Sequence, residues 1–124
     1  MTFMCRGIRG ATTARANTKE AILEATREML EQLVKANGLQ NDSIAAAIFS
    51  TTRDLNAEFP AVAARLMGWT GVALLDTHEM DVPDALPSCI RALILVNTDK
   101  QAHELVNVYL RGAVNLRARR MEER

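Results

Sequence analysis

The segment SCIRALILVNT, residues 88–98, limits the choice of fold more than any other part of the sequence. Successive side chains of a β-strand point to opposite faces of a sheet. One face of this segment would carry Cys89, Arg91, Leu93 and Leu95, and the other Ile90, Ala92, Ile94 and Val96. Because both faces are mostly apolar, we expect a buried strand.

Arg91 places a charge inside this apolar strand. An unpaired guanidinium in apolar surroundings would cost several kcal/mol, so either a carboxylate of the protein or a bound anion must pair with it. On spacing alone a buried salt bridge is the favoured explanation, with Glu79 as the obvious partner. A position in solvent at a strand end is the ordinary alternative for Glu79.

Strand-like and helix-like segments alternate along the chain. Asn17 and Glu20 have the spacing of a capping box, and the Asn-Gly pair at 37–38 is a typical helix end. We expect strands over residues 3–10, 43–52, 71–79 and 88–98, and helices over residues 17–37, 60–68 and 98–112.

This order, β-α-β-α-β-β-α, predicts an α/β fold in the α+β sense, with one mixed sheet and helices on one face. A length of 124 residues fits one compact domain, so we expect a single domain over 1–124. Residues 118–124 have only Met121 as an apolar anchor and are expected to form a flexible tail. The other face of the sheet would stay bare, which favours a symmetric homo-oligomer.

Composition argues against several classes of partner. The chain has 15 basic and 15 acidic residues and no basic run interleaved with aromatic residues, so nucleic acid and anionic membranes are poor candidates. No apolar run reaches the roughly 18 to 20 residues that a membrane span needs, and the N-terminus lacks the apolar region of a secretory signal. Cys5 and Cys89 lie in apolar strand-like segments and are expected to be buried, reduced thiols of a cytoplasmic protein.

The sequence carries no recognisable motif for a metal, a cofactor or a covalent nucleophile. His78 and His103 have no partner at ligand spacing. What remains is a set of strand arginines, Arg6, Arg9 and Arg91. Since Arg6 and Arg9 are three residues apart, they face opposite ways, and at most one of them reaches a given pocket. An enzyme built this way would use neither covalent catalysis nor a cofactor.

Three further residues have ordinary structural explanations when spacing alone is considered. Arg65 lies on the expected short helix, where a solvated helix face is the simplest interpretation. Phe59 and Tyr109 belong to a set of three Phe, one Trp and one Tyr, and aromatic residues more often pack in a core than line a ligand.

Six motifs follow one another along the chain: RGIRGATT (6–13), STTRDLNAEFPAVAAR (50–65), GW (68–69), EMDVP (79–83), CIR (89–91) and VYLRGAVNLR (108–117). In this order, and over nearly the whole chain, they resemble a chorismate mutase of the AroH class. The resemblance implies a homotrimer that forms a pseudo α/β barrel, with active sites between subunits. It also implies conversion of chorismate to prephenate, without a cofactor, in phenylalanine and tyrosine biosynthesis.

The resemblance further implies the residues of the active site. Arg9 would bind a substrate carboxylate, and Arg91 would reach the ether oxygen. Glu79 would be the catalytic carboxylate, and Tyr109 would contact the substrate. The adjacent subunit would contribute three residues, and two C-terminal residues would close over the site: Phe59, Ala61 and Arg65, and Leu116 and Arg117.

Three positions depart from the family pattern. Val62 stands where the family often has lysine, so one long-range cation is missing. Asp76 stands where a cysteine commonly precedes the glutamate by three, which brings a second carboxylate near a dianionic substrate. Like charges would raise one pKa or demand a cationic neighbour. Leu75 replaces a polar residue, although a backbone contact there would survive the change. We count Leu75 and Asp76 among the expected substrate-binding residues.

The implied chemistry suits these residues. The reaction is an intramolecular [3,3] rearrangement, in which no proton moves and no bond to the enzyme forms. The catalyst must restrain the flexible ether and stabilise the charge that gathers on its oxygen. With the family in view, Arg91 is expected to have no full-time protein partner and to be held ready for the substrate.

Two other functions stay open at this point. A Rid-type imine deaminase also binds small carboxylates between the subunits of a trimer, but the EMDVP and CIR motifs argue against it. A non-catalytic trimeric module that binds a small carboxylate is conceivable because of Asp76.

Overall fold

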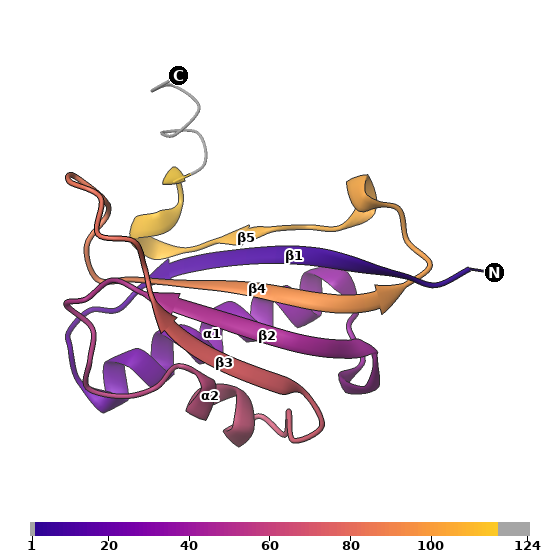
Figure 1. Cartoon of the computed structure of the whole chain (residues 1–124), viewed down its shortest axis with the longest axis horizontal. Helices are drawn as coiled ribbons and strands as arrows, with labels where there is room; N and C mark the ends of the chain where they lie inside the picture. The colour runs from indigo at the N-terminus through magenta and orange to yellow at the C-terminus, as the bar shows by residue number, and fades with distance from the viewer. Residues whose placement is uncertain (1, 117–124) are drawn as a thin grey trace.

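The structure, a computed structural model, describes residues 2–116. Its helices and strands are β1 (Met4–Thr13), α1 (Lys19–Asn37), β2 (Ile44–Thr51), α2 (Ala61–Leu66), β3 (Ala73–His78), β4 (Cys89–Thr98) and β5 (Val108–Tyr109). The five strands form one mixed sheet in the order β3-β2-β4-β1-β5. The helices α1 and α2 contact each other and lie behind the sheet in Figure 1. The predicted mixed sheet with helices on one face is therefore confirmed.

The strand β4 lies at the centre of the sheet, antiparallel to both β1 and β2. Its side chains on the helix side are buried, including Ile90 and Ile94, each with 0% exposure. Those on the other side are less covered, and Leu93 is 37% exposed. The prediction of a buried strand is thus confirmed on one face and holds only in part on the other.

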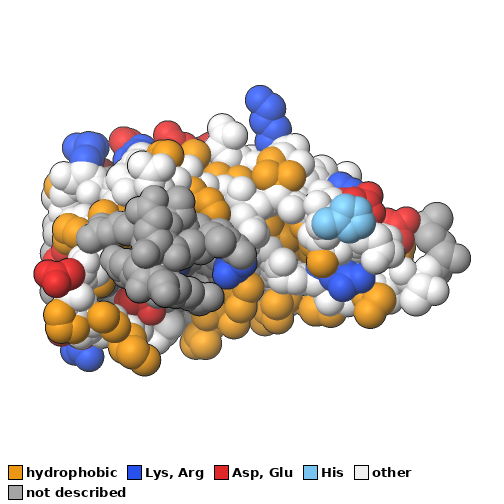
Figure 2. All heavy atoms as spheres, turned by 90° about the horizontal axis from the view of Figure 1, so that it is seen from above, with side chains coloured by type: hydrophobic (Ala, Val, Ile, Leu, Met, Phe, Trp, Pro, Cys, Tyr) orange, Lys and Arg blue, Asp and Glu red, His pale blue; other side chains and the backbone are white. Residues whose placement is uncertain are grey.

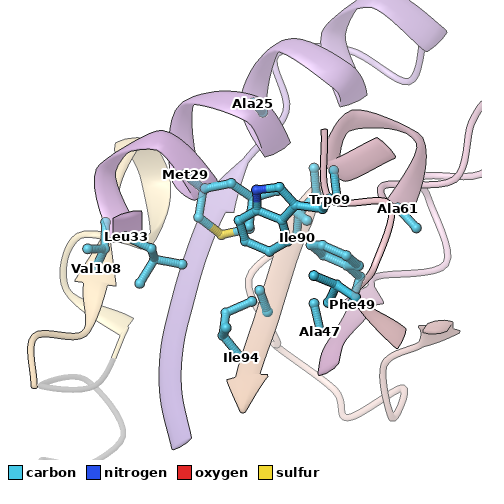
Figure 3. Close-up of a cluster of buried hydrophobic side chains, with 14 of the residues drawn as sticks. Ala25, Met29, Leu33, Ala47, Phe49, Ala61, Trp69, Ile90, Ile94 and Val108 are labelled. Carbon is cyan, nitrogen blue, oxygen red and sulfur yellow. The ribbon is translucent and has the colours of Figure 1, made fainter. Parts of the chain in front are cut away.

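The hydrophobic core fills the space between the helices and the sheet. Figure 3 shows Met29 and Leu33 of α1 above the sheet, with Trp69 between the helices and Phe49 on β2. All four side chains are almost completely buried. Gly10 of β1 passes directly beneath α1, where an added Cβ would lie 2.8 Å from Cδ1 of Leu33. The glycine therefore lets β1 continue to Thr13 instead of ending it at residue 10, as we had expected.

The N-cap of the first helix lies one residue later than predicted. Thr18 is its N-cap, and its hydroxyl accepts a hydrogen bond from the Ala21 N–H at 3.1 Å. Asn17 is engaged elsewhere, because its side-chain oxygen accepts from the N–H groups of Asn56 and Ala57 at 2.9 and 3.0 Å. The predicted end is confirmed: Gly38 adopts a left-handed conformation with φ of 60°.

The predicted helix over residues 98–112 is wrong. The strand β4 runs to Thr98, a single 3-10 turn covers Ala102–Glu104, and β5 then pairs in parallel with β1. The buried side chain of Asn37 explains the difference, because it donates to the Val106 carbonyl at 2.9 Å and accepts from the Val106 N–H at 2.7 Å. These bonds hold the chain extended beside the edge of β1, so tertiary contacts override the local helical spacing.

The sheet has an uncovered side, which we call the open face. Within residues 2–116 neither helix covers it. A cross-strand row of residues runs over it, with Leu75 paired to Ile48, Ile48 to Leu93, and Leu93 to Arg9. Figure 2 views the molecule from above, so the open face, which faces the viewer in Figure 1, lies along its lower edge. Hydrophobic side chains gather along this edge.

Cys5 is an exposed thiol on β1, which corrects the expectation that it is buried, whereas Cys89 is buried as expected.

The described residues contain no helix that combines the length and the apolar character needed to cross a membrane. The expected flexible tail, residues 118–124, lies outside the described part of the chain.

Candidate active site

The open face carries a pocket of about 260 Å³ where β1, β4 and β2 lie side by side. Two arginines line the pocket, and the wall between them is apolar. The lining residues that matter most for its chemistry are Arg9, Arg91, Ile48, Leu93, Tyr109 and Leu116. Of the sequence-predicted site residues, the fold therefore gathers four around one pocket: Arg9, Arg91, Tyr109 and Leu116.

The two arginines reach this pocket because of the strand register. Arg9 pairs with Leu93, and Arg91 pairs with Ala11, so the arginines are diagonal neighbours on one face of the β1–β4 pair. Arg6, three residues before Arg9, points to the opposite side of β1. Two cations held this close on an apolar surface favour a ligand that carries negative charge.

Arg91 forms an ion pair with Glu79. Its Nε lies 3.4 Å from the Oε2 of Glu79, and the two side chains are 32% and 29% exposed. This corrects the expectation that Arg91 has no full-time protein partner and agrees with the salt bridge favoured by spacing alone. A guanidinium has five N–H donors, and the ion pair approaches it at the Nε side. Because both side chains are about one-third exposed, the pair resembles a surface salt bridge and contributes little to stability.

Glu79 is held in place by the backbone of its neighbour strand. Glu79 is one residue beyond the end of β3, and its N–H donates to the carbonyl of Thr51, the last residue of β2, at 2.7 Å. Glu79, Arg91 and Leu116 also line a second, smaller cavity that lies next to the main pocket. The glutamate is thus positioned at the rim of the arginine-lined site.

A set of hydrogen bonds that sequence reasoning missed frames this rim. The Asp54 carboxylate accepts from the Ser88 N–H at 2.8 Å and from the Thr52 hydroxyl. Thr52 in turn accepts from the Cys89 N–H at 3.0 Å. Burial raises the pKa of Asp54, but the donors from Thr52 and Ser88 outweigh it and leave the pKa below its ordinary value. In the TTRD sequence at the end of β2, the Thr52 hydroxyl precedes the Asp54 carboxylate by two residues, and this spacing could have indicated the turn.

Tyr109 and Leu116 come from the far end of the chain. Tyr109 lies on β5 opposite Ala11 of β1, and both Tyr109 and Leu116 are half-buried in the pocket wall. Tyr109 is therefore a wall residue and not a core residue. Arg117 falls outside the described residues.

Five predicted residues line neither this pocket nor the smaller cavity next to it: Phe59, Ala61, Arg65, Leu75 and Asp76. Phe59 is 64% exposed and lines a separate hollow together with Asp76. Ala61 is fully buried at the start of α2, and Arg65 is exposed on that helix. A single chain therefore does not bring this group to the arginine-lined pocket.

Asp76 and Leu75 point to opposite faces of β3. Leu75 is 58% exposed on the open face, whereas Asp76 faces α2 and accepts a hydrogen bond from the Ala61 N–H at 3.0 Å. Burial raises the pKa of Asp76, although the Ala61 N–H and the charge of Arg65 act the other way. The proline at the N-cap of α2, residue 60, has no side-chain acceptor, so a distant group must supply one. The lack of a capping side chain at residue 60 was the sequence signal that could have indicated a distant acceptor such as Asp76.

No cluster of three or more histidine, cysteine, aspartate or glutamate side chains among residues 2–116 is arranged to hold a metal ion. The site therefore consists of fixed cations, one carboxylate, a phenol and an apolar floor. This set can bind and orient an anionic ligand, and it can place a permanent positive charge beside a reacting oxygen.

Comparison with known proteins identifies the family. The model of a family described as chorismate mutase type I matches residues 5–120. The chain is 50% identical to the chorismate mutase AroH of Thermus thermophilus over 115 residues, which covers 92% of this chain and 94% of the relative. It is 42% identical to the chorismate mutase AroH of Bacillus subtilis (strain 168) over 116 residues, covering 93% and 91%.

A solved structure leads to the same family. The chorismate mutase from Clostridium thermocellum superimposes with a TM-score of 0.86 at 48% identity, covering 87% of this chain and 96% of that one. These matches support the mutase interpretation and give no support to an imine deaminase or a non-catalytic module. The chain belongs to the type I chorismate mutase family.

Proposed function

We propose that this chorismate mutase rearranges chorismate to prephenate in the arginine-lined pocket of the open face, as a step of phenylalanine and tyrosine biosynthesis. The observation that carries the proposal is the diagonal placement of Arg9 and Arg91 beside Tyr109 in one pocket. Chorismate has two carboxylates and an ether oxygen that gains negative charge. A pair of fixed guanidinium groups matches this distribution of charge.

Each residue takes a distinct role in this proposal. Arg9 holds a carboxylate, and Tyr109 orients the ligand in the compact shape that the reaction requires. Arg91 lies beside the ether oxygen, whose negative charge grows as the C–O bond breaks ahead of C–C bond formation. A cation fixed there binds the transition state more tightly than the ground state, which raises kcat.

Glu79 has two tasks in the same scheme. Its contact with the Nε of Arg91 restrains the guanidinium before the substrate arrives. Its carboxylate then offsets positive character on the ring fragment and accepts a hydrogen bond from the ring hydroxyl. Because Arg91 is anchored on the central strand, little reorganisation is needed when the substrate binds.

Turnover of the purified chain tests the reaction itself. We expect the absorbance of chorismate to fall on addition of the protein while prephenate accumulates. Absence of turnover at micromolar enzyme would refute the proposal.

We also propose a homotrimer that forms a pseudo α/β barrel, with each site completed by a neighbouring subunit. Two observations support it. The open face exposes large apolar side chains such as Leu75, at 58%, and a sheet face of this kind is usually covered by another copy. In addition, the group around Phe59 and Arg65 is remote from Arg91 within one chain, so a neighbour would have to bring it there.

Mixed subunits test the shared site. Arg91→Leu and Phe59→Asp each damage one half of a site, so each homo-oligomer is expected to be nearly inactive. If the two variants are unfolded together and refolded in equal amounts, random assembly gives about one intact site in four. Activity should return to about a quarter of the wild-type value per subunit. No recovery, from a mixture whose trimeric mass is verified by light scattering, would contradict sites shared between subunits.

We propose a cytoplasmic location as well, because the exposed thiol of Cys5 is typical of proteins from a reducing compartment. Cell fractionation tests this directly, and recovery of the activity in the soluble cytoplasmic fraction is the expected result.

A further inference from the structure

We infer that Arg111 is a positioning residue, which ties the C-terminal segment to α1 and so fixes Tyr109 and Leu116 as a wall of the substrate pocket. The inference rests on the function proposed above for that pocket. It concerns the described part of the segment, residues 108–116, which we call the wall segment.

The contacts of Arg111 converge on α1. Its Nε donates to the Oε1 of Glu28 at 3.1 Å, and its Nη2 donates to the Oε1 of Glu24 at 3.2 Å. The two glutamates are one helical turn apart, so they present their carboxylates side by side to the planar guanidinium. Nη1 also approaches the Thr13 carbonyl at 3.5 Å. The Arg111 side chain is 27% exposed and is the most enclosed member of the group.

The backbone at this point is shaped for the same contact. Arg111 has a φ of 51°, in the left-handed region that side chains with a Cβ rarely adopt. The next residue, Gly112, donates its N–H to the Thr13 hydroxyl at 3.1 Å. A Cβ at Gly112 would lie 2.9 Å from Cγ2 of Thr13, so only glycine allows the approach. The chain thus turns sharply against the end of β1, and the contacts of Arg111 offset the unfavourable conformation.

This attachment lies between the two wall residues. Tyr109 precedes Arg111 by two positions, and Leu116 follows it by five. The strand β5 itself is only two residues long, with one further backbone bond from the Leu110 N–H to the Ala11 carbonyl at 2.9 Å. So short a strand holds its neighbours weakly. Within residues 110–116, the two bonds of Arg111 to α1 add to the bonds that Leu110 and Gly112 make with β1.

The charges of the group support one another. Glu28 raises the pKa of Arg111, and hydrogen bonds from Arg111 and Arg15 lower the pKa of Glu24. Both shifts favour the charged forms of Arg111 and Glu24. Because the group lies on the α1 side of the sheet, away from the pocket lining, its effect on the substrate must pass through the position of the wall segment.

Steady-state kinetics and amide exchange of Arg111→Gln test the inference. We expect KM for chorismate to rise about three- to tenfold, the range that loss of two partly exposed ion pairs would give, while kcat stays within about twofold. The amides of Leu110 and Gly112 should exchange with solvent faster by a similar factor. The double variant Glu24→Gln/Glu28→Gln should reproduce both effects, and adding Arg111→Gln to it should change little more, because the three residues act as one unit.

Arg27→Gln is the matched control. It breaks another arginine–glutamate pair of α1, Arg27 with Glu31 at 3.6 Å, which faces solvent. Its KM and the two exchange rates should stay at wild-type values, and urea unfolding should show that every variant remains folded. An unchanged KM in Arg111→Gln, or unchanged exchange at both amides, overturns the inference.

Failure of the proposed site roles would look different. It would show as full kcat in Arg91→Leu, whereas amide exchange at Leu110 and Gly112 needs no substrate and reports on the wall segment alone.

Discussion

Replacement of Arg91 by leucine separates the chemical role of this residue from its structural one. The substitution removes the fixed charge and the ion pair with Glu79 but keeps an apolar side chain on the central strand. The geometry of the ion pair indicates how much folding free energy the substitution would remove. With the two side chains 32% and 29% exposed and Nε 3.4 Å from Oε2, the pair resembles a surface salt bridge, worth about 0–1 kcal/mol of folding free energy.

The expected loss in catalysis is larger. Removal of one donor from an oxyanion site typically lowers kcat by about 10²- to 10³-fold, or about 2.7–4 kcal/mol of transition-state stabilisation. The barrier should therefore change several times more than the free energy of unfolding. A citrulline at position 91, which keeps the shape but loses the charge, should lose a similar factor.

Two assays on the same preparations measure these quantities. Chorismate consumption gives kcat, and urea unfolding gives the folding free energy. Arg27→Leu, which removes an exposed arginine from α1, is the control and should match the wild-type chain in both. If Arg91→Leu kept near-full kcat, the placement of Arg91 beside the ether oxygen would be wrong.

Two further predictions concern stability. In Asp76→Asn, the folding free energy should depend less on pH than in the wild-type chain. The raised pKa of Asp76 means that the folded chain binds the carboxyl proton more tightly than the unfolded chain does. The wild-type chain therefore loses stability as pH rises from the ordinary aspartate pKa through the raised one. The asparagine oxygen can still accept from the Ala61 N–H, so at neutral pH the variant should be at least as stable, and an identical pH slope in urea titrations would contradict this. In Gly10→Ala, the new Cβ would lie 2.8 Å from an α1 side-chain atom and should cost about 1–3 kcal/mol, whereas Gly71→Ala, with nothing within 4 Å, should be close to neutral by thermal unfolding.

The central strand shows what the sequence could predict. Residues 88–98 form an apolar run long enough to define β4, and the short helix at Pro60 and the helix end at Gly38 follow from local backbone chemistry. These features depend only on residues that are close in the sequence. Local sequence rules therefore suffice to predict them.

The C-terminal segment shows where such rules fail. Its apolar spacing is helical, but the buried Asn37 and the open edge of β1 offer backbone partners that no local pattern reveals. The site shows both cases. Strand parity correctly separates Arg6 from Arg9, and spacing alone favours the Arg91–Glu79 salt bridge. The bond from the Ala61 N–H to Asp76, by contrast, depends on how α2 packs against β3.

The position of β1 also sets when during synthesis the pocket can exist. In the sheet, β1 lies between β4 and β5, so the strand that leaves the ribosome first receives its partners last. Between Thr13 and Cys89 the ribosome must add 75 intervening residues (14 to 88), which takes roughly 4 to 15 s at about 5–20 residues per second. Tyr109 and Leu116 emerge later still, so a nascent chain that carries Arg9 and Arg91 still lacks a wall of its pocket. Enzyme activity in a translation reaction would therefore report completed chains, and products that end before β5 would contribute nothing to it.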